Sequence, residues 1–152
     1  MVAYAILSTD LTISDETENG VRDVVKSHAD GFIKSFAGSE YAEELDFSEE
    51  SVGILDEIIE DSWGDEGPSK QNKVLVVKAF GGYLATIIQN SFRGKWWHDG
   101  KEPVFVLFDG SKPSGIGLTP YSYVVRRFDE GEELSEQWGD MEPLVSERRI
   151  HK

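Results

Sequence analysis

The chain has 152 residues, of which 39% are hydrophobic and 29% charged, and it contains no cysteine. This length and composition are typical of a globular protein, so we expect a single domain over residues 1–152. Without cysteine, a disulfide framework, a thiolate nucleophile and a Cys-ligated metal are excluded. The N-terminus has no basic segment, and no apolar run approaches the roughly 18 residues of a membrane span, so we expect a cytoplasmic protein without membrane contact.

The net charge of −14 is concentrated in the first half of the chain. Residues 1–70 carry 18 acidic and 4 basic side chains, whereas residues 71–152 carry 11 of each. Residues 35–69 alone hold twelve Asp or Glu and no Lys or Arg. Such a surface repels nucleic acid and attracts a basic protein. The same charge could instead serve only to keep the protein in solution, so partner binding and solubility are both possible interpretations.

The first part of the chain predicts a short strand or helical lead-in, followed by an amphipathic helix. Ser14 and the acids after it are typical of a helix N-terminus, although Asn19-Gly20 leaves a later start open. Apolar residues then recur at helical spacing until Ala37-Gly38-Ser39 ends the run. His28 lies on the apolar face, where we expect a hydrogen-bonded core residue in preference to a ligand or a base.

Residues 48–63 give the clearest pattern in the chain, an amphipathic helix capped by Ser48 or by Asp46. One face of this helix is apolar, with Val52, Leu55, Ile58 and Ile59. The opposite face carries Asp56, Glu57, Glu60 and Asp61. Burial of the apolar side chains, at roughly 1.5–3 kcal/mol each, outweighs the repulsion among the acids. Residues 64–69 are expected to form an exposed loop.

The segment 74–92 is the most apolar and predicts a single buried helix, with a strand over 74–77 as the alternative. Gly81 and Gly82 interrupt it at a cost of about 1 kcal/mol each in helix propensity, which indicates close approach of another element. The Gly pair lacks the spacing of a phosphate-binding loop.

The C-terminal half changes to strand-like patterning. Residues 95–98 and 101–108 predict a β-hairpin with a two-residue Asp99-Gly100 turn, and 116–118 a third short strand. Thr119 is expected to cap a helix that ends at Gly131, with Arg126 and Arg127 outside its apolar face, where they are candidates to pair with the acidic face within the molecule. The acidic remainder, which contains Trp138, predicts one more helical turn. The expected fold is α+β, with about four helices packed on a small antiparallel sheet.

One cluster in the chain resembles a site, namely Trp96, Trp97, His98 and Asp99. Adjacent strand residues face opposite sides, so at most one of the two tryptophans is buried by the sheet. The other is a candidate aromatic anchor for a partner, with packing in the core or at the sheet edge as the favoured alternative. The histidines at positions 28, 98 and 151 have no metal-ligand spacing, and no catalytic motif is present, so we expect neither metal nor cofactor.

Four segments together resemble a known family. Residues 45–51 entering a helix, 80–84 within a buried helix, 94–97 opening a strand, and 120–131 are similar to an uncharacterised family of small bacterial domains. That family shows a Leu-Asp-(Tyr/Phe)-Ser helix start, a Gly-x-Tyr-Leu helix and a Gly-x-x-Trp strand. The resemblance implies a continuous helix through Gly81 and Gly82 and an α+β arrangement, and it implies no reaction.

Two functions are compatible with these observations. The first is an acidic protein-binding module, for example an immunity or inhibitor protein, that meets a basic partner through residues 43–66. Its expected contact residues are Asp56, Glu57, Glu60 and Asp61, together with Trp96 and Trp97. The second is a small-molecule-binding or enzymatic domain with a pocket between the Gly81 helix and the Trp96 hairpin.

Overall fold

In the computed structural model, which describes residues 4–150, five α-helices pack with a four-stranded antiparallel sheet. This confirms the predicted α+β class. The helices are α1 (Asp15–Phe36), α2 (Val52–Trp63), α3 (Lys70–Ser91), α4 (Pro120–Glu130) and α5 (Leu134–Val145), and 3₁₀ turns precede α2 and follow α5 at η1 (Glu49–Ser51) and η2 (Ser146–Arg148). The strands are β1 (Tyr4–Ile6), β2 (Gly94–His98), β3 (Pro103–Asp109) and β4 (Lys112–Leu118), in the order β1-β4-β3-β2.

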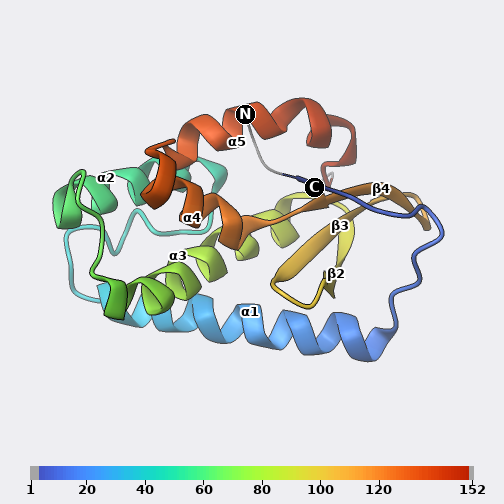
Figure 1. The fold of residues 1–152 in the computed structure, drawn as a ribbon, viewed down its shortest axis with the longest axis horizontal. Coiled ribbons are helices and arrows are strands. Elements are labelled where there is room, and N and C mark those ends of the chain that lie inside the picture. The colour runs from blue at the N-terminus through green and yellow to red at the C-terminus, as the bar shows by residue number, and fades with distance from the viewer. Residues whose placement is uncertain (1–3, 151–152) are drawn as a thin grey trace.

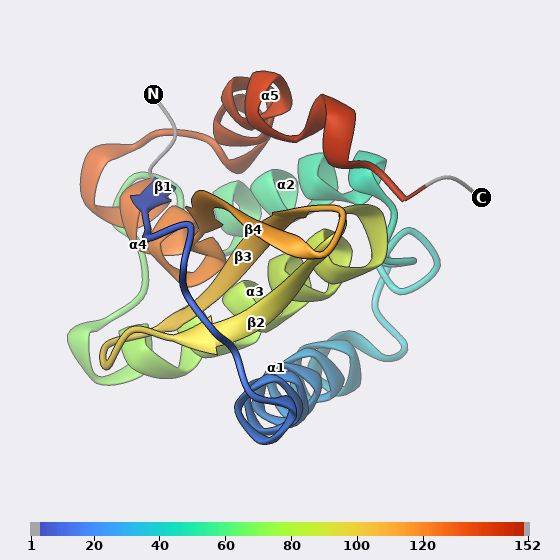
Figure 2. The ribbon, with the colours of Figure 1, turned by 90° about the vertical axis from the view of Figure 1, so that its right-hand side faces the viewer.

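Helix α3 lies at the centre of the molecule. Figure 1 shows α1 alongside it in the opposite chain direction, with α2, α4 and α5 on its other side. Figure 2 shows the strands in front of α3, with α1 at the β2 edge of the sheet. The buried side chains of α3 include Phe80, Tyr83, Leu84, Ile87 and Ile88, which belong to the main hydrophobic core.

Strand β3 is buried on both faces because helices cover one face of the sheet and an N-terminal segment covers the other. Phe105 and Leu107 point into the main core. Val104, Val106 and Phe108 alternate with them and form a second cluster with Ile13, against which Leu7 and Leu11 pack. The segment between β1 and α1 therefore shields the outer face of the sheet.

The two central glycines of α3 are sites of close helix packing, as the sequence predicted. A Cβ atom at Gly81 would lie 2.3 Å from the Tyr121 ring of α4, and one at Gly82 would lie 2.8 Å from the backbone nitrogen of Ala29 in α1. Both distances are too short for a side chain, so α1, α3 and α4 approach each other as closely as they do because these positions carry none. The predicted single helix through both glycines is confirmed.

The helix starts at Ser14 and Ser48 are also confirmed. The Ser14 Oγ accepts a hydrogen bond from the Thr17 N–H at 3.1 Å, and the Ser48 Oγ accepts one from the Ser51 N–H at 3.3 Å. The first turn after Ser48 is a 3₁₀ turn, and α2 itself begins at Val52.

The predicted two-residue turn of the first hairpin is wrong. His98 pairs with Pro103, so the loop comprises the four residues 99–102. The Asp99 carboxylate accepts hydrogen bonds from the backbone N–H groups of Lys101 and Glu102, at 2.8 and 2.9 Å, which stabilises this longer loop. The two-residue turn occurs one hairpin later, because Asp109 pairs with Lys112. Strand β4 therefore starts earlier than predicted.

The predictions for the last part of the chain need two corrections. The acidic remainder forms the 12-residue helix α5, whose buried side chains include Trp138, Met141 and Val145. Arg127, expected outside the apolar face of α4, is buried with 9% of its surface exposed. Its guanidinium lies 3.6 Å from the Glu60 carboxylate, so an acid on α2 compensates its charge.

Candidate functional site

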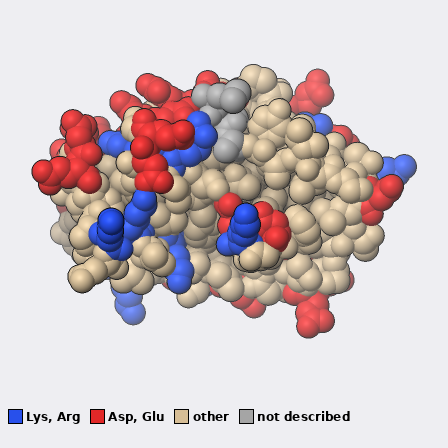
Figure 3. Space-filling view, viewed as in Figure 1, with Lys and Arg blue, Asp and Glu red and all other residues tan. Residues whose placement is uncertain are grey.

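The structure brings together the four carboxylates that the sequence singled out. Asp56, Glu57, Glu60 and Asp61, which we call the acidic surface, line a cavity of about 470 Å³ together with Arg127 and Glu133. In Figure 3, Asp and Glu side chains gather over this end of the molecule, where α2 lies beside the junction of α4 and α5.

Three of these four carboxylates have partners within the fold. Asp56 accepts hydrogen bonds from the N–H groups of Leu134 and Ser135, at 2.7 and 2.9 Å, and so caps the first turn of α5. Glu60 pairs with Arg127. Asp61 accepts a hydrogen bond from the Tyr41 hydroxyl, and this bond raises the pKa of Tyr41 from 10.0 to about 12. Much of this negative charge therefore serves the fold itself.

The two tryptophans lie apart from the acidic surface, toward the sheet end of the molecule (Figure 1). Trp96 is fully buried; its indole Nε1–H donates to the Gln89 side chain at 2.8 Å, and its ring packs edge-on against Phe105. In this conformation a partner cannot contact Trp96. Trp97 is half-buried on the other face of the sheet, where it packs on the cluster around Val104 and Val106.

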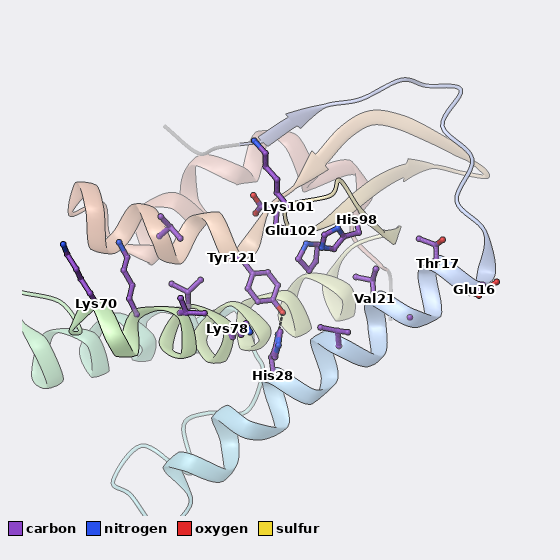
Figure 4. Close-up of a pocket in the computed structure, with 17 residues that line it drawn as sticks. Glu16, Thr17, Val21, His28, Lys70, Lys78, His98, Lys101, Glu102 and Tyr121 are labelled. Carbon is purple, nitrogen blue, oxygen red and sulfur yellow. Dashed lines mark hydrogen bonds between the residues drawn. The ribbon is translucent and has the colours of Figure 1, made fainter.

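A larger cavity, of about 900 Å³, lies between α1, the N-terminal half of α3, α4 and the β2–β3 loop (Figure 4). We call it the groove. Its apolar lining is formed by Val21, Val24, Val74, Val77, Pro103 and Val125. Val24 and Val74 keep 48% and 60% of their surface exposed, so an apolar surface remains open to solvent here.

A hydrogen-bonded pair lies in the middle of the groove. The Nδ1 atom of His28 lies 2.7 Å from the Tyr121 hydroxyl, and the two rings meet edge-on (Figure 4). Burial, and to a smaller extent the charge of Lys78, lower the pKa of His28, while burial raises the pKa of Tyr121. Both groups are therefore neutral near pH 7. The predicted hydrogen bond of His28 is confirmed, but His28 is half-buried in the groove and is not a core residue.

The rim of the groove is basic, although the protein is strongly acidic. Four lysines line it, Lys70, Lys73, Lys78 and Lys101. Two acids line it as well, Glu16 and Glu102, which leaves a formal charge of +2. Glu102 accepts hydrogen bonds from the Ser122 hydroxyl at 2.7 and 2.8 Å, and burial raises its pKa.

The sequence contains a partial signal for this groove, besides the predicted pocket between the Gly81 helix and the Trp96 hairpin. Residues 74–77 are four consecutive apolar residues in what proves to be a helix, and four successive positions spread over the whole helix circumference. Some of them must therefore face solvent, and Val74 and Leu75 do so. The rest of the groove depends on how distant elements pack, which no local pattern reveals.

The titratable side chains of His28 and Tyr121 are hydrogen-bonded to each other in the groove. Residues 4–150 contain no group of three or more His, Asp or Glu side chains that could hold a metal ion. No helix in the described part of the chain is long and apolar enough to cross a membrane.

Comparisons of the chain with models of protein families, with curated proteins and with solved structures found no match. The resemblance to a family of small bacterial domains therefore stays a prediction. The structure bears on its two structural implications alone, the continuous helix α3 and the α+β arrangement.

Proposed function

We propose that this protein is a non-catalytic binding module whose groove takes an elongated, mainly apolar small molecule. The observation that supports this most strongly is the open apolar lining, in which Val24 of α1 and Val74 of α3 are both exposed and face the same cavity. The volume of about 900 Å³ lies within the range of small-molecule sites, roughly 300–1,000 Å³, and such sites combine apolar walls with a few polar groups.

The shape of the groove favours an elongated ligand. Gly82 of α3 contacts His28 of α1, and the two helices run in opposite directions (Figure 1). From this contact the lining extends to Glu16 along α1 and, on the other side, to Lys70 along α3. At 1.5 Å per residue each arm is about 18 Å long. A ligand lying across the centre would contact both arms.

Calorimetric titration with dodecyl maltoside, kept below its critical micelle concentration, tests this proposal without relying on charge. We expect saturable binding with a negative heat-capacity change, because the ligand buries apolar surface. Val74→Asn should weaken binding about fivefold or more, since an amide that lacks a partner in an apolar contact costs roughly 1–3 kcal/mol.

Leu75→Asn is the matched control for this experiment. Leu75 is the next residue of the same helix and is 66% exposed, but it does not line the groove. Its substitution should leave the affinity unchanged. Equal losses in the two variants would show that binding is not in the groove, and the absence of binding to any dodecyl amphiphile would contradict the proposed function.

The acidic surface supports a second candidate function, that of an immunity or inhibitor protein for a basic partner. The observation in its favour is the gathering of five carboxylates around one cavity, four of which belong to the half of the chain that holds all the excess charge. Binding of a co-purifying basic protein should then weaken with added salt and in the variant that combines Glu57→Lys with Glu60→Lys. Binding that is insensitive to both would contradict this candidate.

A further inference from the structure

We propose that the ligand of the groove is an anionic amphiphile, a single apolar chain that carries one carboxylate or phosphate. Lys78, beside the His28–Tyr121 pair, holds the anionic head, and the chain lies on the valines of the groove. This inference rests on the proposed binding function and adds the chemical class of the ligand and the position of its charge.

The charge of the rim points to an anion. The groove carries a formal charge of +2 on a chain whose net charge is −14. Lys73 forms an ion pair with Asp129. Lys70, Lys78 and Lys101 form no ion pair with any carboxylate in residues 4–150, although acids are almost twice as frequent as bases in the chain. Three ammonium groups around an apolar cavity are thus available to a ligand.

Lys78 and His28 define where the head binds. Lys78 lies close enough to His28 for its charge to add to the effect of burial on that imidazole, and both side chains line the groove. The Nδ1 atom of His28 is occupied by Tyr121, and Nε2 makes no hydrogen bond within the described chain. When Tyr121 donates to Nδ1, the neutral ring carries its proton on Nε2, so it can donate to an anion beside the Lys78 ammonium.

The walls of the groove favour an alkyl chain over a peptide. Helices α1, α3 and α4 form most of the lining, and beyond their first turns their backbone N–H groups are used in helix hydrogen bonds. The edge strand β2 reaches the lining only with its last residue, His98, so the groove offers no run of strand edge to pair with an extended peptide. An alkyl chain needs no hydrogen bonds, and contact with Val21, Val24, Val74 and Val77 is sufficient to bind it.

The test compares amphiphiles that share a dodecyl chain and differ in the head group, each below its critical micelle concentration. Dodecanoate and dodecyl phosphate distinguish the two anionic heads, dodecyl maltoside is neutral, and dodecyltrimethylammonium is cationic. We expect at least one anion to bind roughly tenfold more tightly than the maltoside, the factor that a charge-assisted hydrogen bond supplies, and the cation to bind most weakly. Added salt should reduce this preference.

Substitutions of single lysines show where the anionic head group of the ligand binds. Lys78→Gln should remove most of the roughly tenfold preference for the anion and leave the affinity for dodecyl maltoside unchanged. Lys34→Gln is the control, because Lys34 lies on α1 away from the groove lining and should have no effect on either ligand. A loss of maltoside binding in Lys78→Gln would show a structural role and overturn the assignment of Lys78.

The other outcomes are also decisive. If dodecyl maltoside binds as tightly as both anions, the inference about the head is overturned and the groove remains a binding site for neutral chains. If none of the four amphiphiles binds, the proposed function itself fails. If the protein does not bind monomeric amphiphiles but binds an acidic amphipathic peptide, or vesicles containing an anionic phospholipid, the proposed class of ligand is wrong.

Discussion

The acidic surface and the groove differ in whether their charges remain available after folding. The acidic surface is contiguous in sequence, yet Asp56 caps α5, Glu60 pairs with Arg127 and Asp61 accepts the Tyr41 hydroxyl. The groove is assembled from four distant elements, and three of its lysines keep no ion-pair partner among residues 4–150. The density of charge in a sequence is therefore a poor guide to the charge that a folded protein offers to a ligand.

Among the substitutions that compare the two regions, glycine to alanine should give the largest difference in the free energy of unfolding. Gly82→Ala, beneath the groove, should lower the free energy of unfolding by about 1–3 kcal/mol, because the new Cβ meets the α1 backbone at 2.8 Å. Gly53→Ala, on α2, should raise it by up to about 1 kcal/mol, because nothing lies within 4 Å and alanine is the better helix former. Urea unfolding measures both, and destabilisation by Gly53→Ala would contradict this packing.

Some acids of the acidic surface have partners within the described part of the chain and others do not, so substitutions of neighbouring acids should change the stability of the protein by different amounts. Asp56→Ala should destabilise the protein by about 1 kcal/mol, as expected for the loss of a helix cap. Glu57→Ala should change stability by less than about 0.5 kcal/mol, because Glu57 is exposed. Thermal unfolding of the two variants measures the difference. Equal effects would mean that Asp56 does not cap α5 in solution.

Titration of Tyr41 reports on the same surface. Its pKa should be close to 12, because ionisation would place a phenolate beside Asp61, and Asp61→Asn should move it back toward 10.0. Since the pKa is raised in the folded state, this contact stabilises the fold below pH 10.0 and its contribution is lost as the pH rises through 12. The ultraviolet absorbance of the protein and of Tyr41→Phe is followed as the pH rises, and the difference between the two curves gives the titration of Tyr41. A midpoint that is not shifted would contradict the Tyr41–Asp61 contact.

A smaller shift in pKa is expected for His28, at the centre of the groove. NMR titration of His28 should give a pKa below 6.5, and Lys78→Gln should raise it only part of the way, because burial is the larger cause. A lowered folded-state pKa means that the contribution of His28 to stability is present above pH 6.5 and is lost as the pH falls through the folded value. A pKa above 6.5 would contradict the environment described here.

Local chemistry explains what the sequence predicted correctly. The caps at Ser14 and Ser48 require a hydroxyl in the right place, and the close approach at Gly81 and Gly82 follows from two glycines in an apolar helix. Helix α2 was predicted because Val52, Leu55, Ile58 and Ile59 fall on one face, and all four are buried. These features depend on neighbours within a few turns.

Apart from the hairpin turn at residues 99–102, which depends on local contacts of Asp99, the errors and omissions involve contacts between distant segments. Helix α5 was predicted too short, because its N-terminus is capped by Asp56, 78 residues before Leu134. Arg127 was placed outside the apolar face of α4 because of its helical spacing; it is nevertheless buried, because Glu60 of α2 compensates its charge. The groove is lined by α3 and the first hairpin, the two elements between which the sequence predicted a pocket. The contributions of His28 from α1 and Tyr121 from α4 were missed, because only the packing around Gly81 and Gly82 brings them together.

The most direct test of the central claim, that the groove and not the acidic surface is the ligand site, is a titration of the ¹⁵N-labelled protein with dodecanoate, followed in ¹H–¹⁵N spectra. We expect saturable shifts of the amide signals of groove residues, including Val24, Val74 and Lys78, while those of Glu57 and Asp61 stay unchanged. Shifts confined to α2, or no shifts at all, would contradict the account.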